Sequence, residues 1–81
     1  MKQSQNVFIT GASSGLGKQM AKEFASRGYN LALTARRLDI LDALKLELEH
    51  EYKIKVFVAS LDVQDPQQTG EVLAAAAKEL G

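Results

Sequence analysis

Apolar and polar residues fall in blocks that predict three strands, each followed by a helix. Short apolar runs at 6–10, 31–34 and 54–59 predict strands, because continuous apolar stretches are typical of parallel strands covered on both faces. Apolar residues recur at helical spacing over about 15–27, from about 38, and from Pro66 onward. Alternating strands and helices predict parallel pairing with right-handed crossovers, with the third helix on the opposite face of the sheet.

The apolar stripe of each helix predicts its buried face. Gly28 stands where the first helix needs a left-handed cap, and Asp65 and Pro66 predict the N-cap and first residue of the third. The expected buried residues of the three helices are, in turn, Leu16, Met20 and Phe24 with Ala21 and Ala25; Leu41, Leu44 and Leu48; and Val72, Leu73, Ala76 and Leu80.

Composition narrows the classes of function. The 81 residues make one small domain, and its ten basic residues balance its ten acidic ones, which gives no reason to expect nucleic acid as a partner. With no cysteine and one histidine, neither a disulfide nor a metal site is expected. No segment approaches the length of a membrane span or a signal peptide, so we expect a cytoplasmic protein that does not enter membranes.

A glycine-rich segment links the first strand to the first helix, and it reads Thr10-Gly11-Ala12-Ser13-Ser14-Gly15-Leu16-Gly17. A strand, a glycine-rich turn and a helix start are the phosphate-binding arrangement of a dinucleotide fold, because glycines let the backbone approach a pyrophosphate. The sequence therefore predicts a Rossmann-type α/β fold, in which three strands of order 3-2-1 form half of a doubly wound parallel sheet.

A glycine-rich segment between a strand and a helix has two other interpretations. A P-loop is excluded, because the spacing from Gly11 to Gly17 is one residue too long and Gln19 replaces the Ser or Thr that holds magnesium. The glycines could also serve only to make a tight turn between strand and helix, and the sequence leaves this alternative open.

The segment resembles the TGxxxGxG fingerprint of the short-chain dehydrogenase/reductase family, and Leu61-Asp62-Val63 resembles the acidic dipeptide that follows the family's third strand. The resemblance implies that Gly11, Ser13, Ser14, Gly15, Leu16 and Gly17 line the adenosine and pyrophosphate side of a dinucleotide. It also implies that Asp62 and Val63 lie at the adenine ring. From the residues alone, Asp62 could equally be a loop carboxylate or a cap.

The end of the second strand bears on the choice between NAD and NADP. Ala35 stands where an NAD-binding fold carries the acid that holds the ribose 2′-hydroxyl, and Arg36 and Arg37 follow. An arginine can give charge-assisted contacts to a ribose 2′-phosphate, which a carboxylate would repel. We therefore expect NADP as the cofactor, with Arg36 in contact with its 2′-phosphate and Arg37 as a solvated residue ahead of the helix. The alternative interpretation is that both arginines are surface charges without a ligand.

No catalytic residue is expected within the 81 residues. Neither Tyr29 nor Tyr52 is followed four residues later by lysine, which is the spacing of the family's Tyr-x-x-x-Lys pair. The resemblance thus implies residues 1–81 to be the NADP-binding N-terminal half of an oxidoreductase acting on a carbonyl or secondary alcohol, inactive alone. The alternatives are a non-catalytic dinucleotide-binding or sensing module and a structural folding unit. The first strand, left at the sheet edge without charge or proline, predicts a homo-oligomer, most simply a two-fold dimer joining first strands, or else marginal folding.

Overall fold

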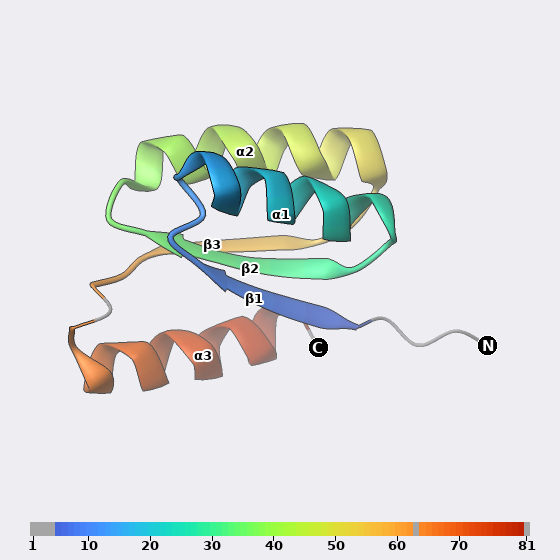
Figure 1. Cartoon of the computed structure of the whole chain (residues 1–81). Coiled ribbons are helices and arrows are strands. Elements are labelled where there is room, and N and C mark those ends of the chain that lie inside the picture. Colours follow the sequence, from blue (N-terminus) through green and yellow to red (C-terminus); the bar gives the residue numbers. More distant parts are fainter. Residues whose placement is uncertain (1–4, 63, 81) are drawn as a thin grey trace.

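The computed structural model describes residues 5–62 and 64–80, over which three parallel strands form one sheet between two layers of helices (Figure 1). The elements are, in chain order, β1 (Asn6–Thr10), α1 (Gly15–Ser26), β2 (Asn30–Ala35), α2 (Leu38–Tyr52), β3 (Val56–Ser60) and α3 (Pro66–Leu80). β2 pairs in parallel with both β1 and β3, which confirms the strand order 3-2-1. Strand β3 begins two residues later than the sequence predicted and ends one residue later.

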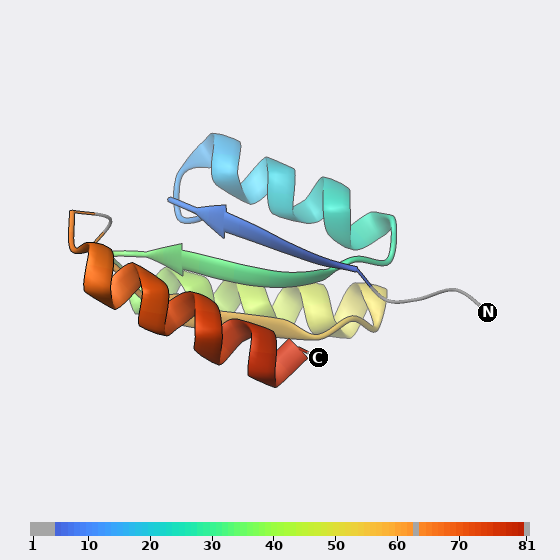
Figure 2. The same ribbon diagram turned by 90° about the horizontal axis from the view of Figure 1, so that it is seen from below.

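The helices lie on opposite faces of the sheet, as predicted. Helices α1 and α2 cover one face and α3 covers the other (Figures 1 and 2). The larger core lies under α1 and α2, and it includes Leu31 and Leu33 of β2 with Leu41, Leu44 and Leu48 of α2. The smaller core lies under α3, where Ala76 and Leu80 pack on Ala32. No helix in the described part of the chain is long and apolar enough to cross a membrane.

Strand β2 is the centre of the sheet, and all six of its residues are buried. Leu31, Leu33 and Ala35 face the larger core, so alternation places Thr34 on the α3 face with Ala32. The Thr34 side chain is fully buried, and its Oγ1 has no hydrogen-bond partner among the described residues. A buried hydroxyl without a partner lowers the stability of the fold.

The predicted buried face of α1 is confirmed for Ala21 and Ala25 and is wrong for Leu16 and Met20, while Phe24 is half-buried and packs against the larger core. Gly17, Ala21 and Ala25 form the buried face, whereas Leu16 is 72% and Met20 42% exposed. Small residues let the helix pack closely on the sheet, and the larger side chains turn toward the free edge of β1. There they line an open hollow of about 390 Å³ together with residues 7–11. In α3, Leu73 is likewise 46% exposed rather than buried.

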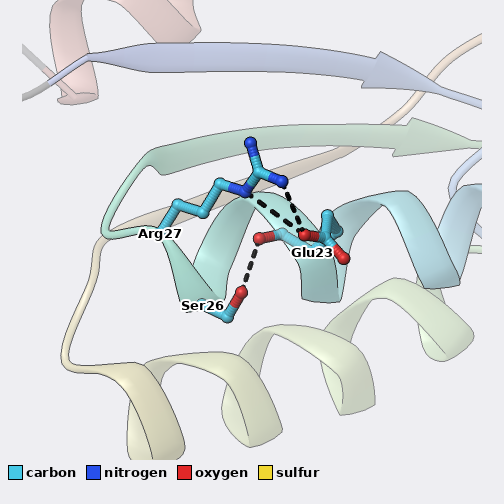
Figure 3. Close-up of polar contacts among 3 residues, drawn as sticks. All are labelled: Glu23, Ser26 and Arg27. Atoms are coloured by element: carbon cyan, nitrogen blue, oxygen red, sulfur yellow. Dashed lines mark hydrogen bonds and ion pairs between the residues drawn. The ribbon is translucent and has the colours of Figure 1, made fainter.

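The end of α1 is fixed by local hydrogen bonds (Figure 3). The Arg27 guanidinium contacts the Glu23 carboxylate, with 3.0 Å between Nη2 and Oε2, and the Ser26 hydroxyl donates to the Glu23 carbonyl at 2.7 Å. Gly28 follows with φ +88°, which confirms it as the left-handed residue that ends the helix. The chain can then turn directly into β2 at Asn30.

Candidate functional site

The three strands end at one edge of the sheet, and the predicted site residues follow these ends. Hydrogen bonds connect the three loops: Ala12 N donates to Thr34 O at 3.0 Å, and Leu61 N donates to Ala35 O at 3.0 Å. The Ser60 hydroxyl also donates to Arg36 O at 3.3 Å. The glycine loop, the arginines and the loop after β3 are therefore held beside one another. In open parallel sheets, ligands bind at this carboxyl edge.

Each glycine of the loop has its own geometric reason. Gly11 has φ +66°, a conformation that side chains other than glycine rarely adopt, and it makes the tight turn out of β1. A Cβ at Gly17 would lie 2.4 Å from Gly11 O and 2.8 Å from the Cα of Ala12, so only glycine lets α1 approach the loop this closely. Apart from its chain neighbours and the backbone of its own helix, a Cβ at Gly15 would meet no described atom within 4 Å. The space at Gly15 is thus open to a ligand.

The first turn of α1 has hydrogen-bond donors to offer an anion. Ser14 is the N-cap: its Oγ accepts from Gly17 N at 3.0 Å and donates to Gly11 O at 2.9 Å. Within the described residues, the N–H groups of Gly15 and Leu16 donate to no protein acceptor. The first turn of α1 also contains no acidic residue. Unpaired N–H groups at a helix start attract negative charge.

The two arginines after β2 have different surroundings. Arg37 forms a bidentate pair with Asp39, with 3.2 Å from Nε to Oδ1 and 3.0 Å from Nη2 to Oδ2. These hydrogen bonds lower the pKa of the Asp39 carboxyl below its usual range and raise that of Arg37. Arg36 is exposed, and among the described residues its guanidinium makes no ion pair. Arg36 is therefore the arginine with free donors at this edge.

Asp62 has a structural role in the loop before α3. Its Oδ1 accepts from Gln64 N at 3.0 Å, and its own N donates to Gln68 Oε1 at 3.2 Å. Asp65 then caps α3 by accepting from Gln68 N at 3.1 Å, as predicted. The loop-carboxylate role that the sequence left open for Asp62 is thus observed, whereas the capping role belongs to Asp65. Val63, expected beside it, lies outside the described residues.

Sequence reasoning missed two features of this edge. One is the double hydrogen bond of Ser14, for which a serine just before the helix start was the available signal. The other is the Arg37–Asp39 pair, which bridges only two positions across the start of α2 and has no periodic signature. No group of three His, Cys, Asp or Glu side chains able to hold a metal is found within residues 5–62 and 64–80.

Fold and site together define a nucleotide-binding α/β domain of the dehydrogenase type. The sequence matches the short chain dehydrogenase family over residues 5–81, and the chain belongs to this family. An uncharacterized oxidoreductase of Mycobacterium tuberculosis is 51% identical over 78 residues, which are 95% of this chain and 31% of the relative. Sulfoacetaldehyde reductase of Chromohalobacter salexigens is 46% identical over 69 residues, covering 85% of this chain and 26% of the reductase.

Solved structures show the same fold. The alcohol dehydrogenase of the archaeon Thermococcus sibiricus, complexed with 5-hydroxy-NADP, superposes with a TM-score of 0.91 at 35% identity, covering 98% of this chain and 34% of the enzyme. A short-chain dehydrogenase of Sphingobium yanoikuyae in complex with NADPH gives 0.77 at 40% identity, covering 83% of this chain and 26% of that protein. The chain thus spans between about a quarter and a third of the length of these relatives.

Proposed function

We propose that residues 1–81 are the NADP(H)-binding N-terminal half of a short-chain oxidoreductase that transfers hydride to or from a carbonyl or secondary alcohol. The proposal rests above all on one observation: the first turn of α1 offers unpaired N–H groups beside the open space at Gly15. A pyrophosphate is the dinucleotide group that such a helix start accommodates. The solved relatives complexed with 5-hydroxy-NADP and NADPH support this choice of ligand.

The glycine loop would hold the pyrophosphate through the N–H groups of Gly15 and Leu16. Ser14 fixes the loop by bonding Gly11 and Gly17 at once, so these donors are preorganised before a ligand arrives. Ser13, half-buried in the same loop, would line the adenosine side. The bound cofactor would supply the hydride; the residues described here bind and orient it and contribute no proton donor.

Arg36 would read the ribose 2′-phosphate. It follows the buried Ala35, which brings no carboxylate to repel a phosphate, and its guanidinium has no competing ion pair within the described residues. Asp62, and Val63 as the sequence predicts, would lie at the adenine ring. Because Oδ1 of Asp62 already accepts from Gln64 N, an adenine amino group would share this oxygen or use the second one.

The test of cofactor choice is the dissociation constant of NADPH and of NADH for the 81-residue chain. Arg36→Ala should weaken NADPH about ten- to a hundredfold, since hydrogen bonds to charged groups contribute roughly 1.5–3 kcal/mol, and should leave NADH nearly unchanged. Arg27→Ala is the matched control, because Arg27 lies at the other end of α1 and is paired with Glu23. Equal losses of both cofactors in Arg36→Ala would show that Arg36 does not read the phosphate.

Gly15→Val tests the pyrophosphate assignment separately from folding. Apart from its chain neighbours and the backbone of its own helix, no described atom lies within 4 Å of a Cβ at this position, so the variant should fold like the wild type while its side chain occupies the ligand's space. We expect it to lose NADPH and NADH alike, with a urea midpoint no lower than that of the wild type. A folded Gly15→Val chain that binds NADPH as the wild type does would refute the assignment of the loop.

A further inference from the structure

The Arg37–Asp39 pair lies next to the arginine that would read the 2′-phosphate. Arg36 and Arg37 are consecutive, and the pair uses two guanidinium nitrogens of Arg37 on the two oxygens of one carboxylate. Both side chains of the pair are about two-thirds exposed, at 67% and 66%. The pair is therefore formed in water, where such contacts are weak enough to be exchanged for another anion.

Asp39 is also the only acidic residue in the first turn of α2. It shares an open hollow between α1 and α2 with Lys18, Lys22 and Glu47, and the last two form their own ion pair at 3.4 Å. Of the four charged side chains that line this hollow, Lys18 is the one that forms no ion pair within the described residues. Arg36 and Arg37 directly precede α2, so Asp39 is the carboxylate of this helix that lies nearest to them along the chain, with Asp42 one turn further on.

We propose that Asp39 is a positioning residue that sets how strongly the site discriminates NADP(H) from NAD(H), because it holds Arg37 away from the ribose 2′-phosphate and leaves Arg36 as the single reader. This inference rests on the proposed function. Two effects act in the same direction: Arg37 must give up its bidentate contact before it can bind a phosphate, and the carboxylate repels the phosphate. Both effects vanish for a cofactor that lacks the 2′-phosphate.

The experiment measures the dissociation constants of NADPH and NADH for the wild type and for Asp39→Asn. The asparagine keeps the shape of the side chain and removes its charge, so Arg37 becomes free to turn to the phosphate. We expect NADPH to bind about two- to fivefold more tightly, the range expected from freeing an exposed ion pair, and NADH binding to stay nearly unchanged. Circular dichroism checks that the variant is folded.

Two further variants separate this role from a general charge effect. Asp42→Asn removes the same charge one turn later in α2, where no ion pair is formed within the described residues, and should leave the ratio of the two constants unchanged. In an Arg37→Gln background, Asp39→Asn should keep only the part of its effect that comes from removing the carboxylate's repulsion, because there is no second arginine to release. This double-mutant comparison measures the coupling directly.

The outcomes distinguish the inference from the function on which it rests. A tighter NADPH complex in Asp39→Asn but not in Asp42→Asn, with a clearly smaller gain in the Arg37→Gln background, supports it. An unchanged ratio in Asp39→Asn, together with the expected loss of NADPH in Arg36→Ala, refutes the role of Asp39 and leaves the proposed function standing. An equal gain in Asp42→Asn reduces the effect to net charge and also refutes it. A wild-type chain that is folded by circular dichroism and binds neither cofactor overturns both proposals.

Discussion

Replacing Gly17 by alanine tests how closely α1 packs on the glycine loop. The added Cβ would lie 2.4 Å from Gly11 O, 2.8 Å from the Cα of Ala12 and 3.1 Å from the carbonyl carbon of Gly11. All three neighbours are backbone atoms, so no side-chain rotation can relieve the contact. Either the first turn of α1 or the loop must move.

Two opposing contributions set the size of the effect. Alanine in place of glycine within a helix gains about 1 kcal/mol from its higher helix propensity. Overpacking a closely packed site costs roughly 1–3 kcal/mol, and contact with the backbone places Gly17 toward the upper end of this range. We therefore expect Gly17→Ala to lower the free energy of unfolding by about 1–2 kcal/mol, or the melting temperature by roughly 4–8 °C per kcal/mol in a domain of this size.

Gly70→Ala is the matched control. Gly70 lies inside α3, is exposed, and a Cβ there would meet no atom within 4 Å. The same substitution should raise stability by up to about 1 kcal/mol. Urea unfolding followed by circular dichroism at 222 nm measures both variants. If Gly17→Ala proved as stable as Gly70→Ala, the close approach between α1 and the loop would not exist and the steric reasoning would fail.

The remaining predictions concern a buried hydroxyl, an exposed ion pair and a free sheet edge. The fully buried hydroxyl of Thr34 has no hydrogen-bond partner among the described residues, and Thr34→Val replaces it by a methyl group. The variant should be more stable by about 1 kcal/mol in urea unfolding. A loss of stability would reveal a hydrogen-bond partner for Thr34. Hydrogen bonds from Arg37 lower the pKa of the Asp39 carboxyl and so add a small, salt-sensitive contribution to the stability of the fold. This contribution is present above the pKa of the unfolded state and is lost as the pH falls through the lower pKa of the folded state. In an NMR titration of Arg37→Gln, the pKa of Asp39 should return to the ordinary aspartate range. The chain should self-associate at micromolar concentration through the uncharged edge of β1. In sedimentation, Met20→Glu beside this edge should weaken the association, whereas Leu46→Glu on α2 should not. A cooperatively folded wild-type monomer would contradict this prediction.

Most of the fold follows from local signals in the sequence. Each strand is a short apolar run, α3 begins directly after Asp65, and α1 ends ahead of Gly28, which has φ +88°. Helix α2 has no such signal, because Arg37 makes no side-chain cap and the left-handed residue that ends the helix is Lys53. The strand order and the crossing of α3 follow from the handedness of parallel connections. These features are local or topological, and they do not depend on how individual side chains pack.

The burial of α1 could not be predicted in the same way. Helical spacing places Leu16 and Met20 on one stripe and Ala21 and Ala25 on the next, and periodicity favours the larger residues. The helix instead turns its small residues inward, because α1 packs closely on the sheet and Gly17 contacts the loop backbone. Close approach of two elements is a tertiary property that no spacing records.

The candidate site, like the fold, combines features that the sequence predicts with one that it does not. The glycine positions and the arginines at the end of β2 could be read from the sequence, since their order along the chain is enough to place them at one edge. The pairing of Arg37 with Asp39 could not, because it depends on the rotamers of two exposed side chains at the start of α2. The difference between two neighbouring arginines therefore emerges only from the structure.

The central claim is that this edge binds the adenosine 2′-phosphate side of NADP(H). Its most direct test is an amide NMR titration of the 81-residue chain with adenosine 2′,5′-bisphosphate and, separately, with adenosine 5′-monophosphate. We predict that both ligands shift the amide signals of Gly15 and Leu16, that only the bisphosphate also shifts Arg36, and that it binds at least about tenfold more tightly. Equal affinities, or shifts confined to residues away from the glycine loop, would contradict the claim.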